Sequence, residues 1–81
     1  MPYFVYVIRS EQTGRLYKGM TENLESRLAA HNARKVRSTK AYVPWVLVHQ
    51  EEYKTEDEAR RRELFLKSGY GREFLKRQGI D

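Results

Sequence analysis

An acidic side chain interrupts the apolar stripe of the second long helix that the sequence predicts. Ala59, Leu66 and Tyr70 recur at helical spacing, and Glu63 falls between them on the same stripe. A carboxylate directed at a protein core is costly unless it pairs with a cation or holds a metal ion. Residues 60–62 are all Arg, so an ion pair and a metal ligand both remain possible interpretations of Glu63.

Two further polar side chains lie on the first predicted helix, residues 22–32. Arg27 and His31 are four residues apart and share one arc of the helix with Leu24 and Leu28. A guanidinium is a planar fork that matches the oxygens of a phosphate. The simpler alternative is a solvated Arg and a His that interacts with the helix dipole.

The elements that position these residues predict an α+β fold in a single domain, residues 1–81. The first strand is apolar throughout, which is typical of a strand covered on both faces. Gly14 suits the positive φ of a hairpin turn after it. The order β-β-α-β-α-α implies a three-stranded, largely antiparallel sheet flanked by helices. The expected strands span residues 3–9, 15–20 and 44–53, and the expected helices span 22–32, 56–68 and 71–78.

Capping residues mark the ends of the predicted helices. Thr21 is expected to cap the first helix, and the stretch 55–58, Thr-Glu-Asp-Glu, forms a capping box for the second. Gly69 is expected to end the second helix as a left-handed cap, and Gly79 to end the third.

The charge of the chain is positive and unevenly distributed. The formal net charge is +5 and the sequence pI is about 9.7. No acidic residue occurs between positions 26 and 50, and this window contains Arg27, Arg34, Lys35, Arg37 and Lys40. A positive surface of this kind attracts polyanions such as nucleic acid, although a solvated basic loop would have the same composition.

The composition also indicates in which cellular compartment the protein is expected. The chain has no Cys, which excludes a disulfide framework and a thiolate zinc site and favours a reducing cytoplasm. The N-terminal apolar run is far shorter than the roughly 20 residues needed to cross a bilayer, so no membrane association is expected.

Taken together, these motifs resemble the GIY-YIG nuclease superfamily, in particular its small stand-alone bacterial members. Phe4-Val5-Tyr6 and the stretch 16–19, Leu-Tyr-Lys-Gly, stand where the family has its paired tyrosine motifs, with ten residues between Tyr6 and Tyr17. Gly19, Arg27 and Glu63 match the glycine after the second tyrosine, the helix arginine and the metal-binding glutamate, and His31 matches a His found in some members.

The sequence departs from the family pattern at several positions. Phe4 and Val5 replace Gly and Ile of the first motif, and Lys18 replaces the central Ile of the second. Met20 follows Gly19, where some relatives have a basic residue, so Lys18 or His31 is a candidate for that role. No Asn follows Glu63, although some relatives have one there.

The resemblance implies Mg²⁺-dependent or Mn²⁺-dependent hydrolysis of phosphodiester bonds in DNA. Glu63 would bind the metal together with waters and phosphate oxygens, and Arg27 would stabilise the transition state. Tyr6 or Tyr17 would activate the attacking water, with the other positioning it and His31 nearby. Room for a phosphate beside Gly19 favours Tyr17 as the base, and the charge of Arg27 would favour its phenolate.

The partner is expected to be DNA, whether single-stranded, branched or duplex, and the oligomeric state is left open. Lys18, Gly19, Arg34, Lys35, Arg37 and Lys40 are the candidate DNA contacts. A non-catalytic nucleic-acid-binding module would use the same basic residues. Glu63 discriminates between the two, because binding to a polyanion gains nothing from an inward carboxylate.

Overall fold

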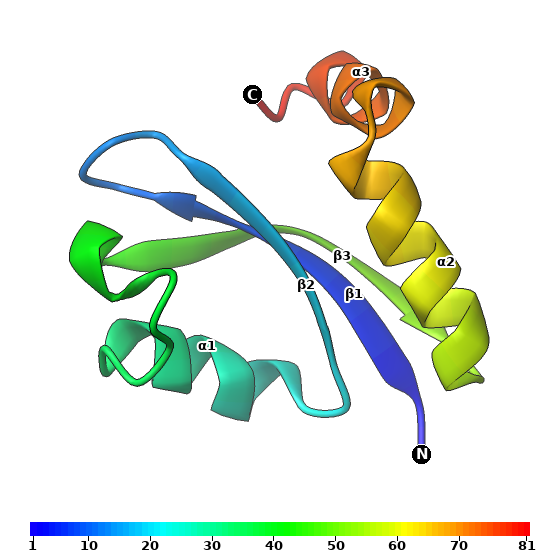
Figure 1. Ribbon diagram of the computed structural model, residues 1–81, viewed down its shortest axis with the longest axis horizontal. Coiled ribbons are helices and arrows are strands. Elements are labelled where there is room, and N and C mark those ends of the chain that lie inside the picture. Colours follow the sequence, from blue (N-terminus) through cyan, green and yellow to red (C-terminus); the bar gives the residue numbers. More distant parts are fainter.

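The first strand, β1 (Tyr3–Ser10), forms the centre of the sheet. The computed structural model describes residues 1–81. β2 (Leu16–Thr21) and β3 (Trp45–Tyr53) flank β1, and both pair with it antiparallel in the order β2-β1-β3 (Figure 1). The helices are α1 (Leu24–Asn32), α2 (Glu56–Lys67) and α3 (Gly69–Arg77), with a short 3₁₀ turn at Lys40–Tyr42. The predicted α+β fold and order of elements are therefore confirmed.

The side chains of β1 divide the molecule into two cores. Val5 and Val7 face α2 and pack in one cluster with Ala59 and Leu66. The alternate residues, Tyr6 and Ile8, face the other side, where Leu24 and Leu28 of α1 and the buried Trp45 cover them. Because all these β1 side chains are at most 2% exposed, the apolar run reflects burial on both faces, as predicted.

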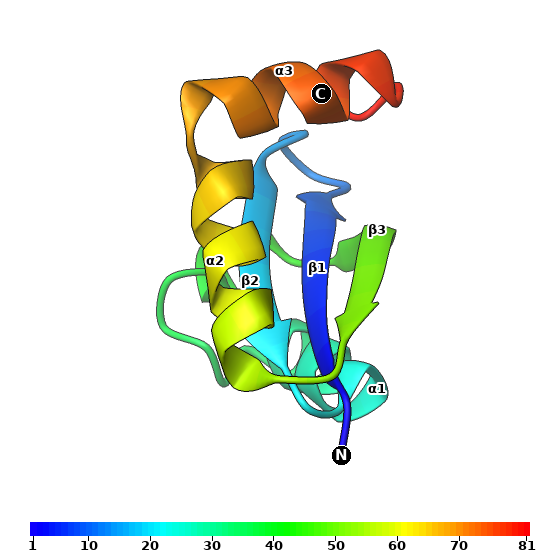
Figure 2. The same cartoon turned by 90° about the vertical axis from the view of Figure 1, so that its right-hand side faces the viewer.

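Figure 2 shows α2 along one face of the sheet and α1 near the opposite face, with α3 crossing near the end where β1 stops and β2 begins. Gly14 has a φ of 80°, so the glycine turn predicted between β1 and β2 is confirmed. No helix is both long and apolar enough to cross a membrane.

The caps follow the predictions in part. The Thr55 hydroxyl accepts a hydrogen bond from the Glu58 amide at 3.2 Å, which confirms Thr55 as the cap of α2, and the Glu58 carboxylate accepts from the Thr55 hydroxyl at 3.1 Å instead of from its amide. The cap of α1 is Asn23 and not Thr21, because the Asn23 side chain accepts from the Ser26 amide at 2.9 Å. Thr21 instead remains in β2, and its hydroxyl accepts from the Asn23 amide.

The junction of α2 and α3 differs from the prediction. Ser68 ends α2 and caps α3: its hydroxyl donates to the Phe65 carbonyl at 2.5 Å and accepts from the Gly71 amide at 3.2 Å. Gly69 is therefore the first residue of α3 and not a left-handed cap. The change of direction also takes Tyr70 off the apolar stripe, so its predicted burial is wrong and its side chain is exposed.

Candidate active site

The two motif tyrosines lie on neighbouring strands of the same sheet face. Tyr6 of β1 pairs with Gly19 of β2, and the rings of Tyr6 and Tyr17 have centroids 6.4 Å apart. A Cβ at Gly19 would lie 2.5 Å from the Tyr6 hydroxyl oxygen, so only a glycine leaves room for this phenol. The space that we expected to admit a phosphate beside Gly19 is occupied by Tyr6, which removes the geometric reason for preferring Tyr17 as the base.

His31 connects the Tyr6 hydroxyl to the basic loop. The imidazole is fully buried, with Nε2 2.9 Å from the Tyr6 oxygen and Nδ1 2.7 Å from the Thr39 hydroxyl oxygen. The Thr39 hydroxyl donates to the Val36 carbonyl at 3.4 Å, so its oxygen accepts from Nδ1–H. Nε2 is then the unprotonated nitrogen, and it accepts the proton of the Tyr6 hydroxyl.

Burial and the nearby positive charge of Arg27 together lower the pKa of His31 from 6.5 to about 4. The imidazole is therefore neutral at physiological pH. Burial raises the pKa of Tyr6, and an interaction with Arg27 only partly offsets that rise. Arg27 thus favours the phenolate of Tyr6, as expected, but burial outweighs this effect, and Tyr6 is a protonated phenol at neutral pH.

Arg27 extends from α1 towards both phenols. Its interaction with Tyr6 raises the pKa of the guanidinium against the effect of partial burial, and Tyr17 contributes in the same direction. Tyr17 also contacts His31 edge-on, with ring centroids 5.1 Å apart. Four of the predicted site residues therefore converge at one place, and they come from β1, β2 and α1.

Glu63 lies on α2, which packs against the other face of the sheet. Its side chain is 14% exposed, and its negative charge is close enough to raise the pKa of Tyr6. The carboxylate forms an ion pair with Lys67, with Oε2 3.0 Å from Nζ, and not with one of the arginines considered above. Since the Lys67 side chain is half exposed, this pair adds little stability, and a competing cation can displace it.

The donor set determines what metal the site could hold. No cluster of three or more His, Cys, Asp or Glu side chains exists that could enclose an ion. A single carboxylate fits Mg²⁺, which keeps several of its waters and binds through one or two carboxylates and substrate phosphates. Glu63 therefore fits a metal that is completed by the substrate.

The predicted basic contacts divide between two surfaces. Arg34, Lys35, Arg37 and Lys40 are exposed on the loop after α1, and none of them forms an ion pair. Lys18 lies on β2 opposite Val7, so it faces the α2 side of the sheet, away from the phenols.

Sequence reasoning missed Thr39. It is 1% exposed, and the indole N–H of Trp45 donates to its carbonyl at 2.9 Å. It precedes the 3₁₀ turn in a stretch that reads as a solvated basic loop, eight positions from His31. The one available signal was a second uncharged hydroxyl, beside Ser38, within a run of cations.

Two tyrosines from neighbouring strands and an arginine from α1 meet on one face of a three-stranded antiparallel sheet. Residues 2–77 match the family model described as the GIY-YIG catalytic domain, so the chain belongs to the GIY-YIG family. A GIY-YIG domain implies nuclease-type activity on nucleic acid, and nucleases of this family typically use divalent metal ions.

Within that family the chain is similar to the UPF0213 proteins. It is 40% identical to UPF0213 protein SH2523 of Staphylococcus haemolyticus over 75 residues, which is 91% of this chain and 90% of the relative. It is 36% identical to UPF0213 protein SERP0126 of Staphylococcus epidermidis, with the same coverage. The solution structure of UPF0213 protein BH0048 from Bacillus halodurans superposes with a TM-score of 0.59 at 26% identity, covering 99% of this chain and 87% of that one.

Proposed function

We propose that the protein is a Mg²⁺-dependent or Mn²⁺-dependent DNA endonuclease that hydrolyses phosphodiester bonds, with Tyr6, Tyr17, Arg27, His31 and Glu63 at its active site. The observation that carries the proposal is the Tyr6 hydroxyl, which donates to a neutral His31 while Arg27 and Glu63 act on it from two further elements. A structural ion pair alone would not require this convergence.

In this proposal Tyr6 is the general base and does not have to ionise beforehand. The hydroxyl oxygen accepts a proton from the attacking water as its own proton passes to Nε2 of His31, 2.9 Å away. Burial is the main cause of the low pKa of His31, and the charge of Arg27 is the smaller one; negative charge that develops on the phosphate offsets the Arg27 charge, so His31 becomes more basic during attack. Tyr17, which is less buried than Tyr6, positions the water.

Arg27 and Glu63 act on the phosphate. The guanidinium lies beside both phenols, where it can donate to the non-bridging oxygens as the transition state gains charge. Glu63 would hold the metal ion, which supplies Lewis-acid stabilisation of the phosphate and of the leaving oxygen when bound. Lys67, released from Glu63, is then available to contact the substrate.

The experiment compares Glu63→Gln with Glu56→Gln, a matched change on the same helix at an exposed residue whose ion pair with Arg60 is long, at 3.9 Å. Labelled single-stranded, flapped, nicked and duplex DNA are incubated with Mg²⁺, with Mn²⁺ or with chelator. Wild type and Glu56→Gln should cut, with the preferred substrate defining the strand type. Glu63→Gln should lose at least about 100-fold in rate and retain DNA affinity.

Two results would count against the nuclease. Equal loss of cleavage, binding and folding in Glu63→Gln would make Glu63 a structural residue. Wild-type protein that binds DNA but cuts none of the substrates with either metal would be a nucleic-acid-binding module.

A further inference from the structure

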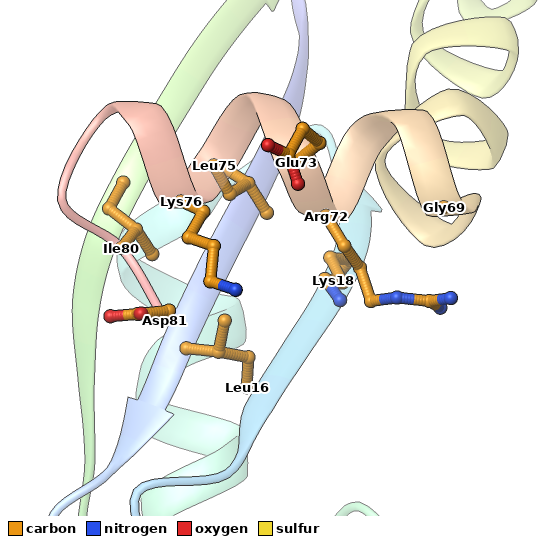
Figure 3. A pocket seen from close by; sticks show the side chains of 9 residues that line it. All are labelled: Leu16, Lys18, Gly69, Arg72, Glu73, Leu75, Lys76, Ile80 and Asp81. Atoms are coloured by element: carbon orange, nitrogen blue, oxygen red, sulfur yellow. The ribbon is translucent and has the colours of Figure 1, made fainter.

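A pocket of about 360 Å³ opens between β2 and α3, on the sheet face opposite the two phenols (Figure 3). Leu16 contributes to its apolar wall from β2, and Leu75 and Ile80 contribute from α3 and the segment after it. The volume lies at the lower end of the range for small-molecule sites, roughly 300–1,000 Å³. We call it the β2–α3 pocket.

Three cations line the β2–α3 pocket from two elements. Lys18 comes from β2, and Arg72 and Lys76 come from α3. None of the three forms an ion pair with a carboxylate. Burial and the charges of Arg72 and Lys67 lower the pKa of Lys18, so these positive groups are held together against their mutual repulsion.

The two acidic residues at the pocket do not neutralise this cluster. In Figure 3 the charged ends of Lys18, Arg72 and Lys76 lie on the β2 side of the α3 ribbon. The carboxylate of Glu73 lies at the level of the helix, and that of Asp81 points away from the cations. The side chains that line the pocket therefore carry more positive than negative charge, three cations against two carboxylates, beside an apolar wall, which fits a nucleotide phosphate with its sugar or base alongside.

Two connections link the β2–α3 pocket to the candidate active-site residues. Lys18 stands between Tyr17 and Gly19 on β2. Lys67 pairs with Glu63, and its charge is one of the causes that lower the pKa of Lys18, so Lys67 connects the candidate metal ligand to the cations of the pocket. A strand that is held at Glu63 can follow this line of cations around β2.

We propose that the β2–α3 pocket binds a phosphate group of the nucleic-acid substrate, at a nucleotide away from the bond that is cut. The identity of the ligand rests on the proposed function. The phosphate comes either from within the strand or from its terminus, and the two sources share the same recognition chemistry: a guanidinium fork and two ammonium groups.

The test measures binding without cleavage, using Glu63→Gln protein in chelator. Fluorescent single-stranded oligonucleotides carrying a 5′-phosphate, a 3′-phosphate or only hydroxyl ends are titrated by anisotropy. Arg72→Ala is compared with Arg77→Ala, which removes the same charge from the same helix at a residue that lines a different groove, beside Tyr70 and Phe74. Arg72→Ala should weaken binding roughly tenfold and reduce the salt dependence by about one ion, whereas Arg77→Ala should change affinity less than about twofold.

The pattern over the oligonucleotides identifies the source. An equal Arg72→Ala penalty on all of them indicates an internal phosphate, and a penalty confined to one phosphorylated end indicates that terminus. Inorganic phosphate should also shift the amide resonances of Lys18 and Gly69, which lie at the pocket. Equal effects of Arg72→Ala and Arg77→Ala on oligonucleotide affinity, or no amide shift with inorganic phosphate, would overturn the proposal that this pocket binds phosphate. Because no metal is present, failure here is distinguishable from failure of cleavage.

Discussion

Thr39 determines which nitrogen of His31 carries the proton. Thr39→Val removes the acceptor of the Nδ1–H bond and leaves a buried donor unsatisfied, which costs about 1–3 kcal/mol. The proton is then free to move to Nε2, where it would block the bond from Tyr6. We expect at least a tenfold loss in cleavage rate, together with a changed ¹⁵N tautomer signature of His31. Thr39→Ser keeps the hydroxyl, so it should retain wild-type values, and a similar loss in this control would refute the tautomer role.

Gly19 shapes the site by having no side chain. A Cβ would lie 2.5 Å from the Tyr6 hydroxyl oxygen and 2.6 Å from Cζ, so Gly19→Ala must displace the ring. Overpacking of this kind typically costs about 1–3 kcal/mol. Gly19→Ala should therefore lower the free energy of unfolding in urea and, by moving Tyr6 from His31, reduce cleavage more than the lost stability explains. Unchanged cleavage would show that the position of Tyr6 is unimportant.

The crossing of α2 and α3 depends on Gly71. A Cβ there would overlap the Phe65 carbonyl and the Leu66 backbone, whereas at Gly69 the nearest atom is the Arg72 guanidinium, 3.8 Å away. Gly71→Ala should therefore destabilise the fold by about 3 kcal/mol or more, because two backbones would have to separate. Gly69→Ala, the same change two residues earlier, should leave the free energy of unfolding within about 1 kcal/mol of wild type. Similar values for the two variants in urea unfolding would contradict this packing.

The elements were predictable where a few neighbouring residues decide them. Thr55 with Glu58 starts α2, Gly14 makes the hairpin, and the apolar run of β1 marks the central strand. The end of α2 was not predictable, because Ser68 bonds to both helices and this depends on how they cross.

The same distinction applies to the candidate site. Its tyrosines, Arg27 and His31 stand at spacings that the family pattern contains. The partners of the site residues are harder to predict. Thr39 contacts His31 only after the basic loop folds back. Glu63 pairs with Lys67, although three arginines directly precede it in the sequence.

Across the whole molecule, Glu51 joins β3 to both C-terminal helices. Arg62 of α2 donates to its carboxylate at 2.7 and 3.1 Å, and the Tyr53 hydroxyl donates at 2.6 Å. The Arg62 guanidinium also lies 4.7 Å above the rings of Phe65 and Phe74, on α2 and α3. Burial would raise the pKa of Glu51, but the bonds from Arg62, His49 and Tyr53 lower it to about 2. The protein thus has one acid-sensitive group on each side of the sheet.

These two groups predict a two-stage loss of stability in acid. Between pH 6.5 and about 4 the unfolded chain binds a proton at His31 while the folded protein does not. The free energy of unfolding therefore decreases by about 3 kcal/mol as the pH is lowered through this range. From pH 4.5 towards 2 the folded protein keeps Glu51 ionised while the unfolded chain protonates it, which adds a further loss. Urea unfolding at pH 7.0, 5.5 and 4.5 measures the first stage. His31→Gln cannot titrate, so its stability should change less over this range; a slope equal to that of wild type would show that His31 is not the buried neutral group between Tyr6 and Thr39.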